Sequence, residues 1–150
     1  MKILIVDDEA LVRNGLKSAI QWESLGISTV LLAEDGIQAL HIAQQELPEI
    51  ILTDARMPRM DGIELAVRLR KTLPNSHLIF MSGYSDKEYL KAAITLKAVS
   101  YVEKPIDRAE IENAVAETVR LHLERSSNMA AQAIRSRMEK ARLAAAMTQI

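Results

Sequence analysis

Five short apolar runs, separated by longer amphipathic segments, constrain the fold of this chain more than any other feature. The runs are predicted strands and cover residues 3–6, 28–33, 50–53, 78–81 and 99–102. Apolar side chains elsewhere recur at the three- and four-residue spacing of helices, over residues 10–20, 36–47, 63–73, 86–96 and from 107 onward. Strands that are apolar throughout are typical of a parallel sheet that helices cover on both faces. Because crossover connections are right-handed, we expect a doubly wound five-stranded α/β sheet.

The composition and the N-terminal sequence exclude several classes of protein. The 150 residues include no cysteine, which excludes a disulfide scaffold, a zinc ribbon and thiol catalysis. The net charge of -1 gives no reason to expect a nucleic acid as a partner. The first strand runs directly into acidic residues, unlike a signal peptide, and no apolar run approaches the roughly 18 residues of a membrane span. We therefore expect a soluble, cytoplasmic protein that has no contact with a membrane.

The charge is unevenly distributed along the chain. Residues 125–150 carry five cationic side chains against Glu139 alone, whereas residues 1–124 are net acidic. We therefore predict a folded domain over 1–124 and a helical extension over 125–150. Within the extension, four apolar residues follow a 4-3-4 spacing: Ile134, Met138, Ala141 and Ala145. Two heptads are too few to establish a coiled coil, so a solvated linker helix, a helix that pairs with itself and a helix that docks on the domain all remain open.

Polar side chains follow the predicted strands at the points where the strands end. Asp7 and Asp8 follow the first strand, Asp54 the third, Ser82 the fourth and Lys104 the fifth. The carboxyl ends of parallel strands meet at one edge of the sheet, so we expect these side chains to converge there. Three carboxylates in one place repel each other, so either one is protonated or a cation neutralises them. Oxygen ligands without histidine or cysteine favour Mg²⁺ over zinc.

A divalent cation beside a carboxylate, a lysine and a hydroxyl suits the handling of a phosphoryl group, which needs positioning and charge neutralisation. Neither of the glycine-rich nucleotide motifs, G-x-x-x-x-G-K-[ST] and G-x-G-x-x-G, occurs in the chain. We therefore expect the phosphoryl group to come from a small donor or from a partner protein.

These residues resemble the receiver domain of two-component response regulators over residues 1–122. The resemblance is carried by Asp7-Asp8, by residues 53–62 around Asp54, by Ser82-Gly83-Tyr84 and by Lys104-Pro105. It implies a flavodoxin-like fold with strand order 2-1-3-4-5. Residues 22–26 and 82–89 are similar to a subgroup in which the receiver precedes an AraC-type helix-turn-helix DNA-binding domain. The resemblance thus implies that this chain lacks its output domain, with a stand-alone receiver acting through protein contacts as the alternative.

The resemblance also implies roles for individual residues. Asp54 is the expected phosphoacceptor for a sensor histidine kinase. Mg²⁺ is expected on Asp8, Asp54 and the backbone carbonyl of Arg56, with Asp7 holding the ion through water. Lys104 and the Ser82 hydroxyl are expected to bind phosphoryl oxygens, and Pro105 to follow a cis peptide bond.

The same resemblance implies a switch and an output. The Tyr101 ring is expected to move from an exposed to a buried position when Ser82 moves. The change would reach the face formed by residues 86–96, 99–102 and the helix from 107, which is a candidate homodimer surface together with the C-terminal helix. DNA would be contacted only through the missing output domain.

Two other functions compete with this interpretation. Phosphohydrolases with an aspartate nucleophile carry a second acid two residues later, where this chain has Arg56. We therefore predict no enzyme activity beyond slow self-dephosphorylation. The other competitor is an interaction module that is never phosphorylated, and the intact set of acids, serine and lysine argues against it.

Overall fold

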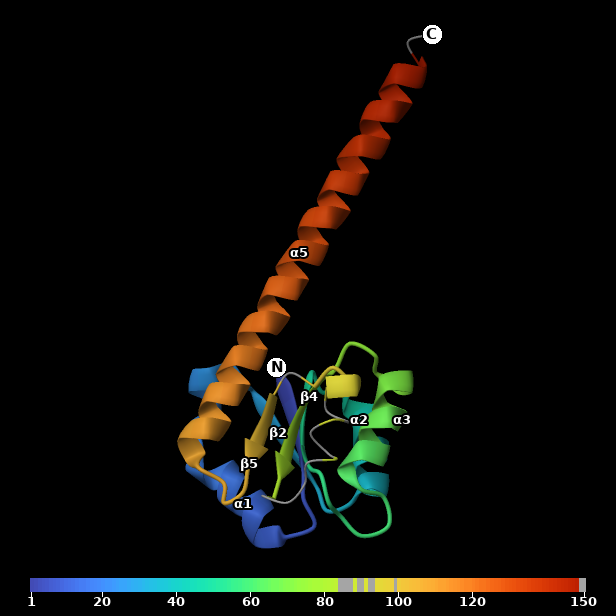
Figure 1. Ribbon diagram of the computed structural model, residues 1–150. Helices are drawn as coiled ribbons and strands as arrows, with labels where there is room; N and C mark the ends of the chain where they lie inside the picture. The colour runs from blue at the N-terminus through green and yellow to red at the C-terminus, as the bar shows by residue number, and fades with distance from the viewer. Residues whose placement is uncertain (84–87, 89–90, 92–93, 99, 149–150) are drawn as a thin grey trace. The chain divides into compact units, whose positions relative to one another are not determined.

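The five predicted strands form one parallel sheet in the order β2-β1-β3-β4-β5, as expected. The computed structural model describes residues 1–83, 88, 91, 94–98 and 100–148 (Figure 1). The strands are β1 (Lys2–Val6), β2 (Thr29–Ala33), β3 (Ile50–Asp54), β4 (His77–Ser82) and β5 (Ser100–Glu103). The sequence prediction of a doubly wound α/β sheet is therefore confirmed.

The centre of the sheet is apolar on both faces. Residues 3–6 of β1 and all residues of β3 and β4 are buried. In the register, Leu4 of β1 lies beside Leu31 of β2 and Ile51 of β3. Both β3 and β4 extend one residue past the predicted runs, so that Asp54 and Ser82 are the final residues of their strands. The strand backbone therefore fixes the main chain of two candidate site residues.

Helices cover both faces of the sheet. They are α1 (Ala10–Ala19), α2 (Gly36–Glu46), α3 (Gly62–Thr72) and the start of α5 (Arg108–Thr148), with a 3-10 helix at Trp22–Leu25. Figure 1 shows α2 and α3 on one face, and α1 and the start of α5 on the other. The Asp35 and Asp61 carboxylates cap α2 and α3 by accepting from the backbone N–H groups of Gln38 and Glu64, each at 2.8 Å. These caps explain why both helices begin where the apolar spacing begins.

The helix α5 passes from one structural unit into another. The two compact units are Met1–Thr118 and Val119–Ile150, and α5 continues without a break through residue 124, where the sequence analysis places a domain boundary. Within the first unit α5 buries Ile111, Val115 and Thr118. In the second unit the described apolar side chains from Leu123 onward are exposed, which agrees with its polar and alanine-rich sequence.

Some expectations fall where the chain is not described. The helix predicted over 86–96 and the subgroup stretch 82–89 lie largely outside the described residues, and so does the first residue of the strand predicted over 99–102. Among the helices in the described part of the chain, none has an apolar stretch long enough to cross a bilayer.

Replacing Arg59 with glycine is expected to stabilise the protein by about 0.5–1 kcal/mol. Arg59 is an exposed residue between β3 and α3, and its φ of 70° lies in the left-handed region, where a Cβ is unfavourable. Urea unfolding followed by fluorescence of Trp22 measures the change. Arg59→Ala is the matched control, because alanine also removes the arginine side chain but keeps the backbone strain. Equal stabilities of the two variants would contradict the argument.

Candidate functional site

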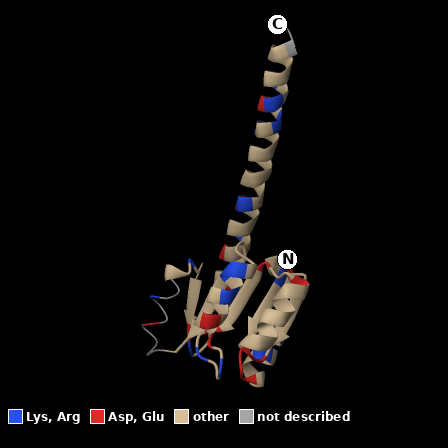
Figure 2. Ribbon diagram, turned by 90° about the vertical axis from the view of Figure 1, so that its right-hand side faces the viewer, with Lys and Arg blue, Asp and Glu red and all other residues tan. Residues whose placement is uncertain are grey.

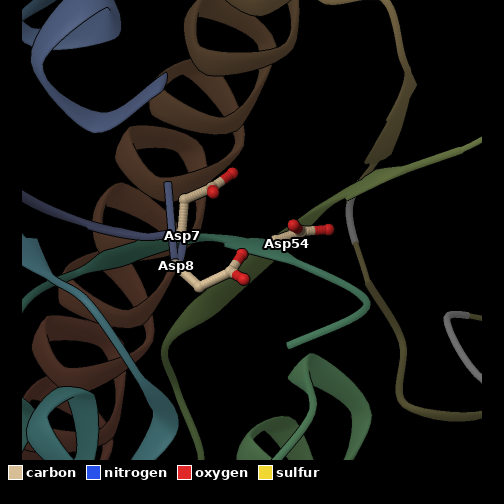
Figure 3. A group of neighbouring side chains, drawn as sticks. All are labelled: Asp7, Asp8 and Asp54. Carbon is tan, nitrogen blue, oxygen red and sulfur yellow. The ribbon is translucent and has the colours of Figure 1, made fainter. Parts of the chain in front are cut away.

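The acidic residues from the first and third strands lie together at the carboxyl edge of the sheet. Asp7 and Asp8 follow β1, Asp54 ends β3, and one carboxylate oxygen from each lies within 4.8 Å of the others. Figure 3 shows the three side chains extending from these two neighbouring strand ends. The convergence expected from the sequence is therefore present.

Asp54 lies at the centre of this group. Its side chain is almost entirely buried, and its Oδ2 accepts a hydrogen bond from Lys104 Nζ at 2.9 Å. Its Oδ1 accepts from the backbone N–H of Arg56 at 3.2 Å. Burial raises the pKa of Asp54, and the hydrogen bond and positive charge of Lys104 oppose that rise. The lysine thus supplies part of the charge compensation that this carboxylate needs.

The negative charge of the Asp7 carboxylate has fewer compensating partners than that of Asp54. The residue is fully buried, and its Oδ1 accepts from the backbone N–H of Glu9 at 2.9 Å. Its Oδ2 has no hydrogen-bond partner among the described residues and lies 3.8 Å from Lys104 Nζ. Burial raises the pKa of Asp7 to about 6, the charge of Asp54 adds to the rise, and the Glu9 hydrogen bond opposes it. A buried carboxylate oxygen without a donor, beside two other acids, fits a site for a hard cation.

Lys104 joins the acids to the strands β4 and β5. Burial alone would lower its pKa, but the hydrogen bond to Asp54 and the charges of Asp54 and Asp7 outweigh burial, so its pKa is raised. The ammonium therefore stays protonated beside the acids. Its backbone N–H donates to the carbonyl of Ser82 at 2.7 Å, and the peptide bond to Pro105 is cis, as the resemblance implied.

The remaining predicted residues lie around this centre. Asp8 and Arg56 are exposed, and Ser82 is buried at the end of β4. Tyr101 lies beside Phe80 in the register of β5 and β4 and is 37% exposed, and its role in a switch stays a prediction.

Three neighbours of the site were given no role by sequence reasoning. A Cβ on Gly62 would overlap the carbonyl oxygen of Asp54, Arg13 Nη1 donates to the carbonyl of Asp7 at 2.7 Å, and the Thr53 hydroxyl donates to the carbonyl of Asp54 at 3.0 Å. All three contacts are with the backbone carbonyl of Asp7 or Asp54, and a sequence pattern does not reveal contacts of this kind. Thr53 and Gly62 lie in the stretch 53–62 that carries the resemblance, and this was their only signal in the sequence.

A comparison with protein families identifies the chain. The profile of the response regulator receiver domain matches residues 3–116, which is most of the sequence. The chain belongs to the response regulator receiver family. Together with the parallel sheet and the acids at its edge, this makes it the receiver domain of a two-component response regulator.

Several known proteins are similar to this receiver. The transcriptional regulatory protein HptR of Staphylococcus aureus strain N315 is 40% identical over 126 residues, which cover 84% of this chain and 49% of that protein. A two-component transcriptional regulator AraC from Clostridium phytofermentans gives a TM-score of 0.78 at 52% identity, covering 83% of this chain and 96% of that one. The receiver domain of AraT, a response regulator from Geobacillus stearothermophilus, gives 0.76 at 37% identity, covering 83% and 97%. The chain thus spans about half the length of the curated relatives it matches.

Proposed function

We propose that this receiver takes up a phosphoryl group on Asp54 from a phosphohistidine of a sensor histidine kinase, in a reaction that depends on Mg²⁺. One observation carries the proposal. The Asp54 carboxylate lies 2.9 Å from the Lys104 ammonium and shares the sheet edge with two further acids within 4.8 Å. Phosphoryl transfer needs this combination of a positioned acceptor and neutralising charge.

The donor set fits Mg²⁺ as the cation. Asp8, Asp54 and the backbone carbonyl of Arg56 would hold the ion directly, and Asp7 would hold it through water. When bound, Mg²⁺ supplies positive charge that offsets the acids and the oxygens of the incoming phosphoryl group. The unpartnered oxygen of Asp7 supports this assignment, because it is buried and acidic and receives no donor from the described residues.

The protein residues have separate roles in the proposed transfer. A carboxylate oxygen of Asp54 forms a bond to phosphorus while the bond from phosphorus to the donor imidazole breaks. The electron pair of that bond returns to the imidazole nitrogen, which takes up a proton from water. Lys104 and the Ser82 hydroxyl each donate to a phosphoryl oxygen. The acyl phosphate carries about 1.5–2 negative charges where the carboxylate carried one, so the Lys104 ammonium has more negative charge to neutralise after the transfer.

The proposed output begins at Ser82 and Tyr101. When Ser82 binds the phosphoryl group, the Tyr101 ring turns inward from its exposed position and changes the face formed by residues 86–96, β5 and the start of α5. A few kcal/mol of differential interaction are enough to shift such a two-state equilibrium. This face, or the exposed part of α5, is proposed as the surface of a homodimer.

The proposed output is transcription, through a DNA-binding domain outside this chain. HptR is named as a transcriptional regulatory protein and the Clostridium phytofermentans protein as a two-component transcriptional regulator, and both names support this proposal. The fact that the match covers 49% of HptR supports it as well. In this proposal residues 1–124 are the receiver and 125–150 are a helical linker. Figure 2 shows that the charged positions along that part of α5 are mainly blue, for Lys and Arg, in keeping with a solvated helix. A stand-alone receiver that acts through protein contacts is the alternative.

Intact mass measurement after incubation with acetyl phosphate tests the phosphoacceptor. We expect wild type to gain one phosphoryl group with Mg²⁺ and none after chelation, and Asp54→Asn to gain none. Asp35→Asn is the matched control, since it makes the same chemical change at a helix cap, where asparagine serves equally well. Uptake by Asp54→Asn at the wild-type level would contradict the assignment of Asp54.

We further propose that the receiver has no phosphatase turnover beyond slow self-dephosphorylation. The second acid of an aspartate-nucleophile hydrolase would stand at residue 56, which is an arginine whose backbone N–H donates to Asp54. Sustained release of phosphate from a phosphate monoester would contradict this.

A further inference from the structure

Arg13 contacts the backbone between two acids of the site. It lies in the first two turns of α1, is partly buried, and donates from Nη1 to the main-chain carbonyl of Asp7 at 2.7 Å. That carbonyl belongs to the peptide group that joins Asp7 to Asp8. A charged donor at this distance forms one of the stronger types of hydrogen bond.

A small set of hydrogen bonds among the described residues holds the turn from β1 to α1, and the Arg13 contact is one of them. Glu9 is the N-cap residue of α1, and its side chain makes no capping hydrogen bond in the described part of the chain. The Asp7 side chain instead accepts from the Glu9 N–H, and the Asp7 N–H donates to Ala33 at 3.2 Å. Asp8 itself is exposed. The Arg13 contact therefore fixes the peptide group from which this exposed acid extends.

The positive charge of Arg13 alone would weaken Mg²⁺ binding at the neighbouring acids. The acids Asp7, Asp8 and Asp54 form the site proposed for Mg²⁺, and a nearby guanidinium repels a divalent cation. A positive side chain that helps Mg²⁺ binding must therefore help by holding the ligands in place. Charge and positioning predict opposite signs for the effect of removing Arg13, so they can be separated by experiment.

We propose that Arg13 is a positioning residue for Mg²⁺: its hydrogen bond to the Asp7 carbonyl holds the Asp7–Asp8 peptide group so that both acids face Asp54. The inference rests on the proposed function of the acids. It assigns to Arg13 no contact with the ion or with the phosphoryl group. Outer contacts of this kind are known to change metal affinity substantially.

Isothermal titration calorimetry with MgCl₂ tests the proposal on the whole chain. We expect Arg13→Met, which keeps the apolar stem and removes the donor, to weaken Mg²⁺ binding about tenfold. Arg13→Lys is expected to recover part of the loss. Lys17→Ala is the matched control: it removes a cation one turn further along α1, from an exposed side chain, and is expected to leave the affinity unchanged or slightly higher.

Two further measurements make the result decisive. Thermal unfolding in the presence of a chelator must show that each variant is folded, and Asp8→Asn in the same titration tests the acid site itself. If Asp8→Asn weakens binding and Arg13→Met does not, the role of Arg13 is overturned while the proposed function survives. If Asp8→Asn binds Mg²⁺ as well as wild type, both are overturned. Tighter binding by Arg13→Met would assign Arg13 a purely electrostatic effect and would also overturn the inference.

Discussion

Replacing Gly62 with alanine is expected to destabilise the receiver by about 3 kcal/mol and to abolish phosphoryl uptake. Gly62 is the first residue of α3, and its N–H donates to the carbonyl of Ala55 at 3.0 Å. A Cβ at this position would overlap the carbonyl oxygen of Asp54 and lie 3.0 Å from the Cα of Ala55. Both contacts are with the main chain, which cannot rotate away as a flexible side chain can. Either α3 or the end of β3 must move, and the second movement displaces the proposed phosphoacceptor.

Urea unfolding followed by Trp22 fluorescence measures the loss of stability, and intact mass measures phosphoryl uptake. Gly15→Ala is the matched control, because a Cβ at Gly15 meets nothing within 4 Å in the described part of the chain. Gly15 lies within α1, so alanine there is expected to stabilise the protein by about 0.5–1 kcal/mol. Wild-type stability of Gly62→Ala would show that the end of β3 has more freedom than the contact distances allow.

Replacing Asp7 with asparagine is expected to stabilise the Mg²⁺-free receiver by about 2–3 kcal/mol at pH 8. The pKa of Asp7 is raised from 3.8 to about 6 in the folded protein, chiefly because burial disfavours the charged form. Between these two values the folded state binds more protons than the unfolded state. The free energy of unfolding of wild type therefore falls as the pH rises through this window, and it stays low above pH 6. Asparagine has no charge, so the free energy of unfolding of the variant does not show this fall with rising pH.

The measurement is urea unfolding in chelator at several pH values. We expect wild type and Asp7→Asn to be nearly equal at pH 4 and to diverge as the pH rises toward 7. Saturating Mg²⁺ is expected to stabilise wild type more than the variant, because only wild type keeps all three acids. Asp8→Asn serves as a comparison, since its exposed carboxylate is hydrated and its loss is expected to matter less. A difference that is largest at pH 4 would contradict the argument.

The strands and most helices of this receiver could be predicted from local sequence. Buried parallel strands must be apolar throughout, and a helix with one buried face must repeat its apolar residues every three or four positions. The strand order followed from the resemblance, and the observed order confirms it. The convergence of Asp7, Asp8, Asp54 and Lys104 could also be predicted, because each directly follows or ends a strand.

The contacts that hold these acids in place could not be predicted in the same way. The short distance between Gly62 and the Asp54 carbonyl depends on how α3 approaches the end of β3. The hydrogen bond from Arg13 to the Asp7 carbonyl depends on the conformation of the turn that leads into α1. Both arise from packing between elements, and periodicity within one element carries no information on such packing. The helix α5 could be predicted, since the sequence indicates helix from residue 107 onward and again over 125–150; its apolar spacing weakens after Thr118, yet alanine and other good helix formers continue the helix.

The positions of the loop between β3 and α3 differ in how freely they can be substituted. Met57 and Met60 are buried, and a side chain on Gly62 at the start of α3 would overlap the Asp54 carbonyl oxygen, whereas Arg56 and Arg59 are exposed. Mutations that persist through selection in this loop are therefore expected to collect at the exposed positions, within a few residues of Asp54. Such changes would alter the surroundings of the proposed phosphoacceptor while the buried residues beneath it stay constant.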